Sequence, residues 1–178
     1  MLLGVMLVAR PGAVSGAESK AQTSIQAQVG WTWVGRPEGR SHTVDLGGRW
    51  ETVFGRSSPR DFGLGPYVEA RTGGFHFGDY GGGLVAVLPV ESTFPFWLGV
   101  GALGRREQGA WAPAGHAFVG WGSRSFNYQS VWGMVYGLTL DGVWHGGDRK
   151  GVDVVVAATL DAQALLYPWL LLVSWVRH

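Results

Sequence analysis

Cysteine is absent from this chain of 178 residues, and lysine occurs only as Lys20 and Lys150. The absence of cysteine excludes disulfides, thiolate metal sites and lipid attachment through an N-terminal cysteine. Charged residues make up 15% of the chain, whereas soluble domains typically carry about 25%. A net charge of +1 gives no indication of a nucleic-acid partner. The composition therefore disfavours an ordinary water-facing surface.

Long apolar runs are also missing, since no stretch reaches the roughly twenty apolar residues that a membrane-spanning helix needs. This disfavours a helical inner-membrane topology. Residues 2–9 form a short apolar run, followed by small residues and a plausible cleavage point after Ala17. We expect residues 1–17 to be a signal peptide for export through the periplasm, although the usual basic n-region is missing. The alternative is an N-terminal helix, which Arg10 and Pro11 would interrupt.

What the chain does contain is a period-two alternation of apolar residues with polar residues or glycine. In the first such segment, Ile25, Val29 and Trp33 share one parity, while Ser24 and Gln28 share the other. Alternate side chains of a strand point to opposite faces. We therefore predict about eight strands in one domain over residues 22–163. The alternating segments are 24–34, 43–54, 62–73, 80–90, 96–105, 115–124, 132–141 and 152–161.

The size of an eight-stranded barrel indicates which face points outward. Its interior is only just wide enough to be filled by side chains, so the tryptophan-rich face would overfill it, whereas a face of glycine, threonine and a few charges fits. We predict an all-β, up-and-down antiparallel transmembrane barrel in the outer membrane. The lipid-facing aromatic residues are predicted to be Trp31, Trp33, Trp50, Phe54, Phe96, Trp121, Trp132 and Tyr136. Other aromatic residues near strand ends, including Trp97, are expected to join this girdle.

Nearly all charges of the alternating segments share the parity of the glycines, which predicts a polar network in the lumen. Arginine suits this position because its guanidinium pairs with carboxylates through several hydrogen bonds. We favour a static salt-bridge core that fills the barrel, with a gated path for small ions as the alternative. The network is predicted to contain Asp45, Arg49, Glu51, Glu69, Arg71, Arg105, His116, Arg124, Asp141, Asp153 and Asp161.

The connections between the segments are short and rich in turn-forming residues. With the N-terminus in the periplasm, the first, third, fifth and seventh connections would face outside. They would place basic residues near an anionic outer leaflet, unless these are ordinary solvated loops: Arg36, Arg40, Arg106, Arg149 and Lys150. Residues 164–178 form an apolar tail, read either as an interfacial helix or as an extension of the last strand.

These features resemble the small eight-stranded outer-membrane barrels of Gram-negative bacteria, the OmpA and OmpX type, over residues 22–163. The resemblance is architectural and implies a structural or surface-interaction role, with outer-membrane lipid and the barrel-assembly machinery as partners. It identifies no protein partner and no cofactor. The final strand departs from the pattern, because such barrels commonly end on an aromatic residue, whereas this chain ends on Arg177 and His178.

Two other classes of function remain open. Some small outer-membrane barrels are lipid hydrolases or acyltransferases, but His42, His76, His116 and His145 show no serine–histidine spacing. They also show no spacing specific for zinc, so no metal site is predicted. A soluble lipocalin-like binder would place the tryptophan-rich face inside. That face would overfill the interior of an eight-stranded barrel.

Overall fold

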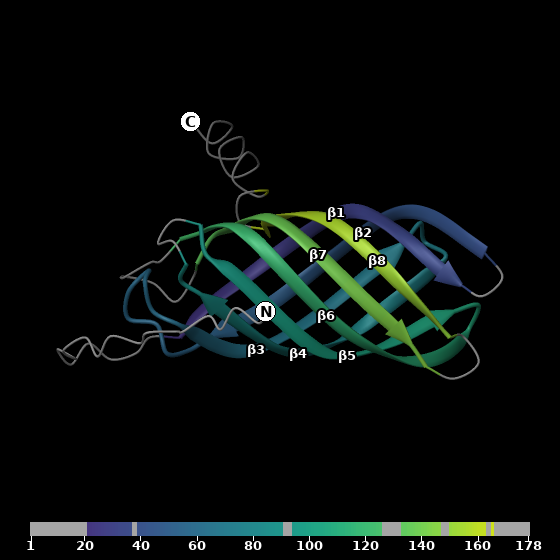
Figure 1. Ribbon diagram of the computed structural model, residues 1–178, viewed down its shortest axis with the longest axis horizontal. Coiled ribbons are helices and arrows are strands. Elements are labelled where there is room, and N and C mark those ends of the chain that lie inside the picture. The colour runs from purple at the N-terminus through teal and green to yellow at the C-terminus, as the bar shows by residue number, and fades with distance from the viewer. Residues whose placement is uncertain are drawn as a thin grey trace, which may run out of the picture.

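The computed structural model describes residues 21–36, 39–90, 94–125, 133–146, 150–162 and 165. The predicted signal peptide and most of the tail lie outside these residues, as does Trp132. Eight antiparallel strands close into a barrel in which each strand pairs with its neighbours along the chain and β1 pairs with β8 (Figure 1). The strands are β1 (Gln22–Arg36), β2 (Gly39–Val53), β3 (Gly63–Gly73), β4 (Phe77–Leu88), β5 (Phe96–Glu107), β6 (Ala110–Arg124), β7 (Val135–His145) and β8 (Gly151–Asp161).

The predicted all-β, up-and-down barrel is confirmed, and each predicted segment overlaps one strand. The predicted boundaries are less accurate, because several hairpins continue beyond the apolar band. Arg40, for example, lies inside β2 and pairs with Gly35 rather than lying in a connection. The seventh strand was predicted over 132–141 but runs from Val135 to His145. Polar residues at strand ends still form backbone hydrogen bonds, so pairing extends beyond the clear alternation.

The two ends of the barrel differ in their connections. We call the end that holds the connections 37–38, 74–76, 108–109 and 146–150 the turn end. The terminal end holds the longer connections 54–62, 89–95 and 125–134, together with Gln22 and Asp161. Gln108 and Gly109 have φ of 49° and 83°, values that suit a two-residue hairpin between right-twisted strands. Within the described residues, no helix is long and apolar enough to cross a membrane.

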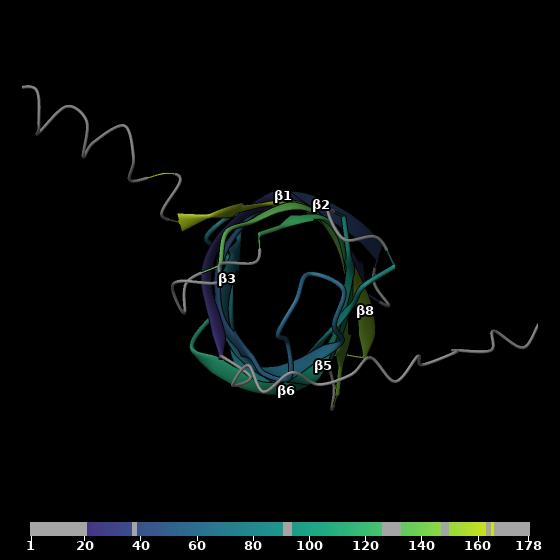
Figure 2. The same cartoon turned by 90° about the vertical axis from the view of Figure 1, so that its left-hand side faces the viewer.

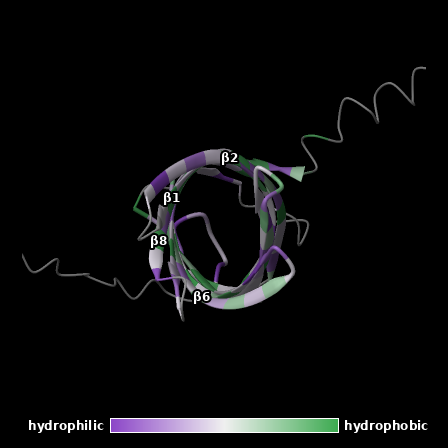
Figure 3. Ribbon diagram, turned by 90° about the vertical axis from the view of Figure 1, so that its right-hand side faces the viewer, coloured by the Kyte–Doolittle hydropathy of each residue, from purple (hydrophilic) through white to green (hydrophobic). Residues whose placement is uncertain are grey.

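Side-chain burial alternates along much of the barrel wall, with most charged groups inside and large apolar side chains outside. Leu138 and Trp50 are each 54% exposed, whereas their chain neighbours Thr139 and Arg49 are buried. Seen from the turn end, hydrophilic and hydrophobic residues alternate along the ribbon (Figure 3). The barrel therefore presents an apolar outer surface around a largely polar interior.

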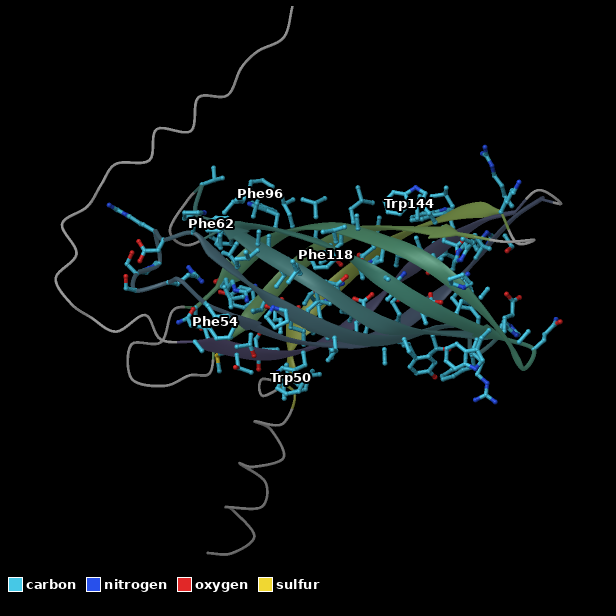
Figure 4. All side chains as sticks on the ribbon, turned by 90° about the horizontal axis from the view of Figure 1, so that it is seen from below. Trp50, Phe54, Phe62, Phe96, Phe118 and Trp144 are labelled. Carbon is cyan, nitrogen blue, oxygen red and sulfur yellow. The ribbon has the colours of Figure 1, made fainter. Side chains whose placement is uncertain are left out.

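Aromatic residues gather near both ends of the outer surface. Phe54, Phe62 and Phe96 lie toward the terminal end and Trp144 toward the turn end (Figure 4). Seven of the eight predicted lipid-facing aromatic residues are described, and all seven are exposed: Trp31, Trp33, Trp50, Phe54, Phe96, Trp121 and Tyr136. Two rings of outward aromatics near strand ends match the girdles of membrane barrels.

Trp97 is the exception, and its assignment to the girdle is wrong. Its side chain is 0% exposed and lies inside the barrel. The indole fits because glycines face it from neighbouring strands: a Cβ at Gly120 would collide with its ring, and one at Gly137 would lie 2.8 Å from it. The interior can therefore hold a tryptophan where the facing residues have no side chain.

Candidate functional site: the barrel interior

The centre of the lumen holds what we call the central cluster: Asp45, Arg49, Glu69, Arg71, His116 and Asp141. Arg49 donates from Nε and Nη2 to Glu69 Oε2 at 2.9 and 2.7 Å, and from Nη2 to Asp141 Oδ1 at 3.2 Å. Arg71 donates from Nη1 to the same oxygen of Asp141 at 3.3 Å. The guanidiniums of β2 and β3 thus meet a carboxylate of β7, so the cluster joins distant parts of the barrel wall.

His116 lies between two carboxylates of this cluster. Its Nε2 is 3.0 Å from Asp141 Oδ1, and its Nδ1 is 3.0 Å from Glu69 Oε1 and from the hydroxyl of Tyr67. Ligand atoms of Glu69, His116 and Asp141 all lie within 4.8 Å of one another. Asp141 Oδ1 already accepts hydrogen bonds from Arg49 and Arg71, with which a metal ion at this position would compete. The geometry is that of an ion-pair network.

A second group, the turn-end cluster, contains Asp79, Arg105, His145 and Asp153. Arg105 binds Asp79 in bidentate fashion, with both nitrogen–oxygen distances at 2.7 Å, and also donates to Asp153 Oδ2 at 2.5 Å. His145 Nε2 lies 2.9 Å from the same Asp153 oxygen. Paired forks of this kind are the strongest protein hydrogen bonds. Asp79 was not predicted, because the fourth strand was expected to begin at Tyr80.

Charge counting shows how the two clusters are balanced. The central cluster sets three carboxylates against two guanidiniums, and the turn-end cluster sets two carboxylates against one. One histidine, His116 or His145, stands beside each excess carboxylate. Each histidine therefore adds a ring nitrogen to a cluster that has more carboxylates than guanidiniums.

The terminal end of the lumen is filled differently. Glu51 accepts a hydrogen bond from Ser24 at 2.9 Å and forms an ion pair with Arg124. Asp161, also buried, pairs with Gln26 in the strand register. This half also holds apolar side chains beside buried polar residues such as Gln26 and Thr159, so the prediction of a polar lumen holds only in part here. The apolar side chains form one buried cluster: Val53, Tyr67, Val85, Val87, Trp97, Phe118 and Val135.

Arg56 closes this end, although the sequence pattern placed it in a solvated connection. Its side chain is 0% exposed and donates to Gln22 Oε1 at 3.3 Å and to the carbonyl oxygens of Asp61 and Pro59 at 3.3 and 3.0 Å. Burial, together with the charge of Arg124, lowers the pKa of Arg56 to about 10. The segment that carries it bends into the ring of strands (Figure 2). The alternation of side chains applies only within strands, so it could not identify the loop residue Arg56 as part of the lumen.

Asp61 holds this loop in shape. One of its carboxylate oxygens accepts hydrogen bonds from the backbone and hydroxyl of Ser57 at 2.8 Å each, and from the backbone of Ser58 at 2.7 Å. Partial burial acts to raise the pKa of Asp61, but these hydrogen bonds outweigh it and hold the pKa below its usual value. These hydrogen bonds therefore fix the conformation of the loop, which points the side chain of Arg56 into the lumen.

All eleven predicted lumen residues are described and buried, and ten of them fall into the three groups above, with Asp161 beside the terminal-end group. These eleven residues contain no arrangement of nucleophile, base and acid of the kind that an outer-membrane enzyme would need. Within the described part of the chain, no serine or threonine hydroxyl hydrogen-bonds to a histidine. His42 stacks on Trp31 at a centroid distance of 5.3 Å. The lipocalin-like alternative needs an apolar cup, whereas the centre of this lumen is charged.

Two solved structures share this architecture. The crystal structure of Neisserial surface protein A aligns with 79% of this chain and 97% of its own, with a TM-score of 0.51 at 11% identity. The fold is that of a small transmembrane β-barrel. A solution NMR structure of a de novo designed protein, TMB2.3, aligns with 81% of this chain and 95% of its own, with a TM-score of 0.42 at 12% identity. No protein-family model and no curated protein matches the chain. At such identities the likeness concerns the fold alone.

Proposed function

We propose that this protein is an outer-membrane barrel with a sealed lumen, which serves a structural or surface-interaction role rather than conducting ions. The observation that carries the proposal is the burial of the side chains along the lumen. Arg105 and Asp79 are 3% and 0% exposed near the turn end, Arg49 is 1% exposed at the centre, and Arg56 is 0% exposed at the terminal end. A continuous aqueous path would expose such groups to water.

The outer surface supports membrane lipid as the partner of the barrel. Large apolar side chains such as Val68, Leu84 and Val100 are each more than half exposed, and together they form a band far larger than a soluble monomer exposes. Lipid would cover this band without a cost in free energy. Export through the periplasm and insertion by the barrel-assembly machinery follow from this proposal as expected steps.

A narrow ion pore is the alternative, and the energetics of the central cluster disfavour it. Ions could pass only if Arg49 separated from Glu69 and Asp141. Breaking a buried pair costs about 3–5 kcal/mol, so the open arrangement would be populated on the order of one part in a hundred or less. Partner exchange alone is therefore a poor gate at this position.

Planar-bilayer conductance tests the sealed lumen, with insertion checked by heat-modifiable migration on a detergent gel. We expect the folded wild-type protein to give no unitary conductance. Trp97→Ala should introduce a leak because it removes the largest buried side chain at the terminal end. Trp121→Ala is the matched control, since its indole lies on the outer surface. Wild-type channels of constant unitary size would establish the pore instead.

A further inference from the structure

The outer surface of the turn end carries a groove of about 260 Å³, which is separate from the lumen. It lies between the turns that join β3 to β4 and β5 to β6. The strand register places Thr72, Gly78 and Arg106 side by side across three strands. Because Gly78 has no side chain, the ring of Tyr80 lies over it and forms part of the floor of the groove.

Aromatic rings border the groove. A Cβ at Gly78 would lie 2.9 Å from the ring of Tyr80, and a Cβ at Gly104 would lie 3.1 Å from the ring of Trp111. Both rings therefore lie along the outer wall over glycines, with their centroids 5.9 Å apart. Arg106 pairs with Trp111 in the register. A cation thus stands at the level of the aromatic girdle, where lipid headgroups meet water.

The exposed charges that the structure describes are mostly basic. Among the described residues, every carboxylate except that of Asp61, at the terminal end, is buried. Arg40, Arg106 and Lys150 are exposed at the turn end, and none of the ion pairs between described residues includes Arg106. The exposed charges of the turn end, as far as its residues are described, are therefore cations, which is complementary to an anionic surface.

Phe75 adds an apolar tip beside the groove. It is 82% exposed and has a φ of 61°, a left-handed conformation that is unfavourable for a bulky residue. Residues held in such conformations cluster at binding sites.

We infer that this groove binds the phosphate of an anionic phospholipid from the leaflet at the turn end. Arg106 would bind the phosphate oxygens through its guanidinium fork, with His76 and Gln108 at the margin of the groove. The acyl chains would lie against Tyr80 and Trp111. The inference rests on the membrane location proposed above but does not depend on a sealed lumen.

Lipid retention measured by native mass spectrometry tests this site. The full chain is refolded into phosphatidylcholine vesicles that contain a minor fraction of phosphatidylglycerol, and retained lipids are counted after mild extraction. We expect the wild-type protein to retain phosphatidylglycerol in preference to phosphatidylcholine. Arg106→Gln should reduce this preference about tenfold, because it removes a charge-assisted hydrogen bond to the phosphate. Arg106→Lys should give an intermediate value.

Arg60→Gln is the control, because Arg60 is an exposed arginine at the terminal end. Equal retention by wild type and Arg106→Gln would overturn the site, as would an equal loss in Arg60→Gln. Release of the lipid by excess inorganic phosphate would show a site for free phosphate and overturn the lipid assignment. A folded barrel that conducts ions but retains phosphatidylglycerol would contradict the sealed lumen and leave this inference standing. Failure to enter vesicles would contradict both.

Discussion

The two halves of the lumen fill the same narrow space with different proportions of charged and apolar side chains. The turn-end half pairs charges across the barrel, as when Arg105 bridges Asp79 and Asp153. The terminal-end half packs Trp97 and valines against glycine backbone and closes with Arg56. What the halves share is the exclusion of empty volume. An eight-stranded interior therefore demands complete filling rather than polarity.

The largest effect is expected from unpairing the charged half. Arg49→Met should lower the free energy of unfolding by about 3–5 kcal/mol, because it leaves Glu69 and Asp141 buried with one fewer cation. Urea unfolding of the barrel in lipid vesicles measures this change. Arg49→Lys keeps the charge but loses the two-nitrogen contact with Glu69, so it should lie between wild type and Arg49→Met. Wild-type stability in Arg49→Met would mean that the central cluster is not paired in the membrane.

The apolar half should respond through a cavity instead of an unpaired charge. Trp97→Ala should cost about 3 kcal/mol, at the lower end of the range for a core tryptophan, because the glycine-lined wall around it can relax inward. The same urea titration measures this loss. Adding Gly120→Val, which refills the space from the neighbouring strand where the Trp97 ring alone fills it, should recover part of it. If Trp97→Ala were as stable as wild type, the terminal end would be loosely packed.

Side chains on the outer surface differ from those of both lumen halves, because their neighbour is lipid rather than protein. Leu138→Arg should cost about 2–4 kcal/mol in a bilayer, since it places a charge near the membrane midplane. Val152→Arg is the control, since Val152 is also outward-facing but lies beside the turn end, where the cost should fall to about 0–1 kcal/mol. Folding yields into vesicles compare the two. Equal yields would mean that the apolar face does not contact lipid.

The smallest effect concerns the loop that closes the terminal end. The pKa of Asp61 is lower in the folded protein than its ordinary value of 3.8, so its contribution to stability is present above that pH and is lost as the pH falls through the folded pKa. Acidification below about pH 4 should therefore speed amide hydrogen exchange at Ser57 and Ser58. Asp61→Asn should remove this pH dependence. A loop with unchanged exchange at low pH would show that other contacts hold it.

The fold was predictable because one physical rule, the alternation of side chains along a strand, acts on the whole barrel. Parity alone assigned Asp45, Arg49 and Asp141 to the interior before any contact was known. Parity also places Trp97 with Gly99 and Gly101, whereas its place as an aromatic residue near a strand end predicts the outer girdle. The glycines that accommodate it lie on other strands, so the fit becomes visible only once the register is known.

The closing of the terminal end could not have been predicted in the same way. Arg56 lies between strands, where no periodicity constrains its direction, and its partners are backbone carbonyls that any sequence offers. The sequence also could not predict which charged residues of the lumen form ion pairs with one another. Eleven charged residues on one parity allow many combinations of partners, and only the stagger of the strands brings Arg105 to Asp79 and Asp153.

The seam between β1 and β8 has a consequence for how the protein is made. Ten residue pairs, from Gln26–Asp161 to Gly35–Val152, join the first strand to the last. Until β8 has been synthesised, one edge of β1 has no partner, while Val29, Trp31 and Trp33 leave its outer face apolar. Such an edge is a template for aggregation, and pairing across so long a sequence separation is slow. The chain therefore needs to be held unfolded from the first strand to the last, so its biogenesis is expected to depend on a chaperone that shields β1.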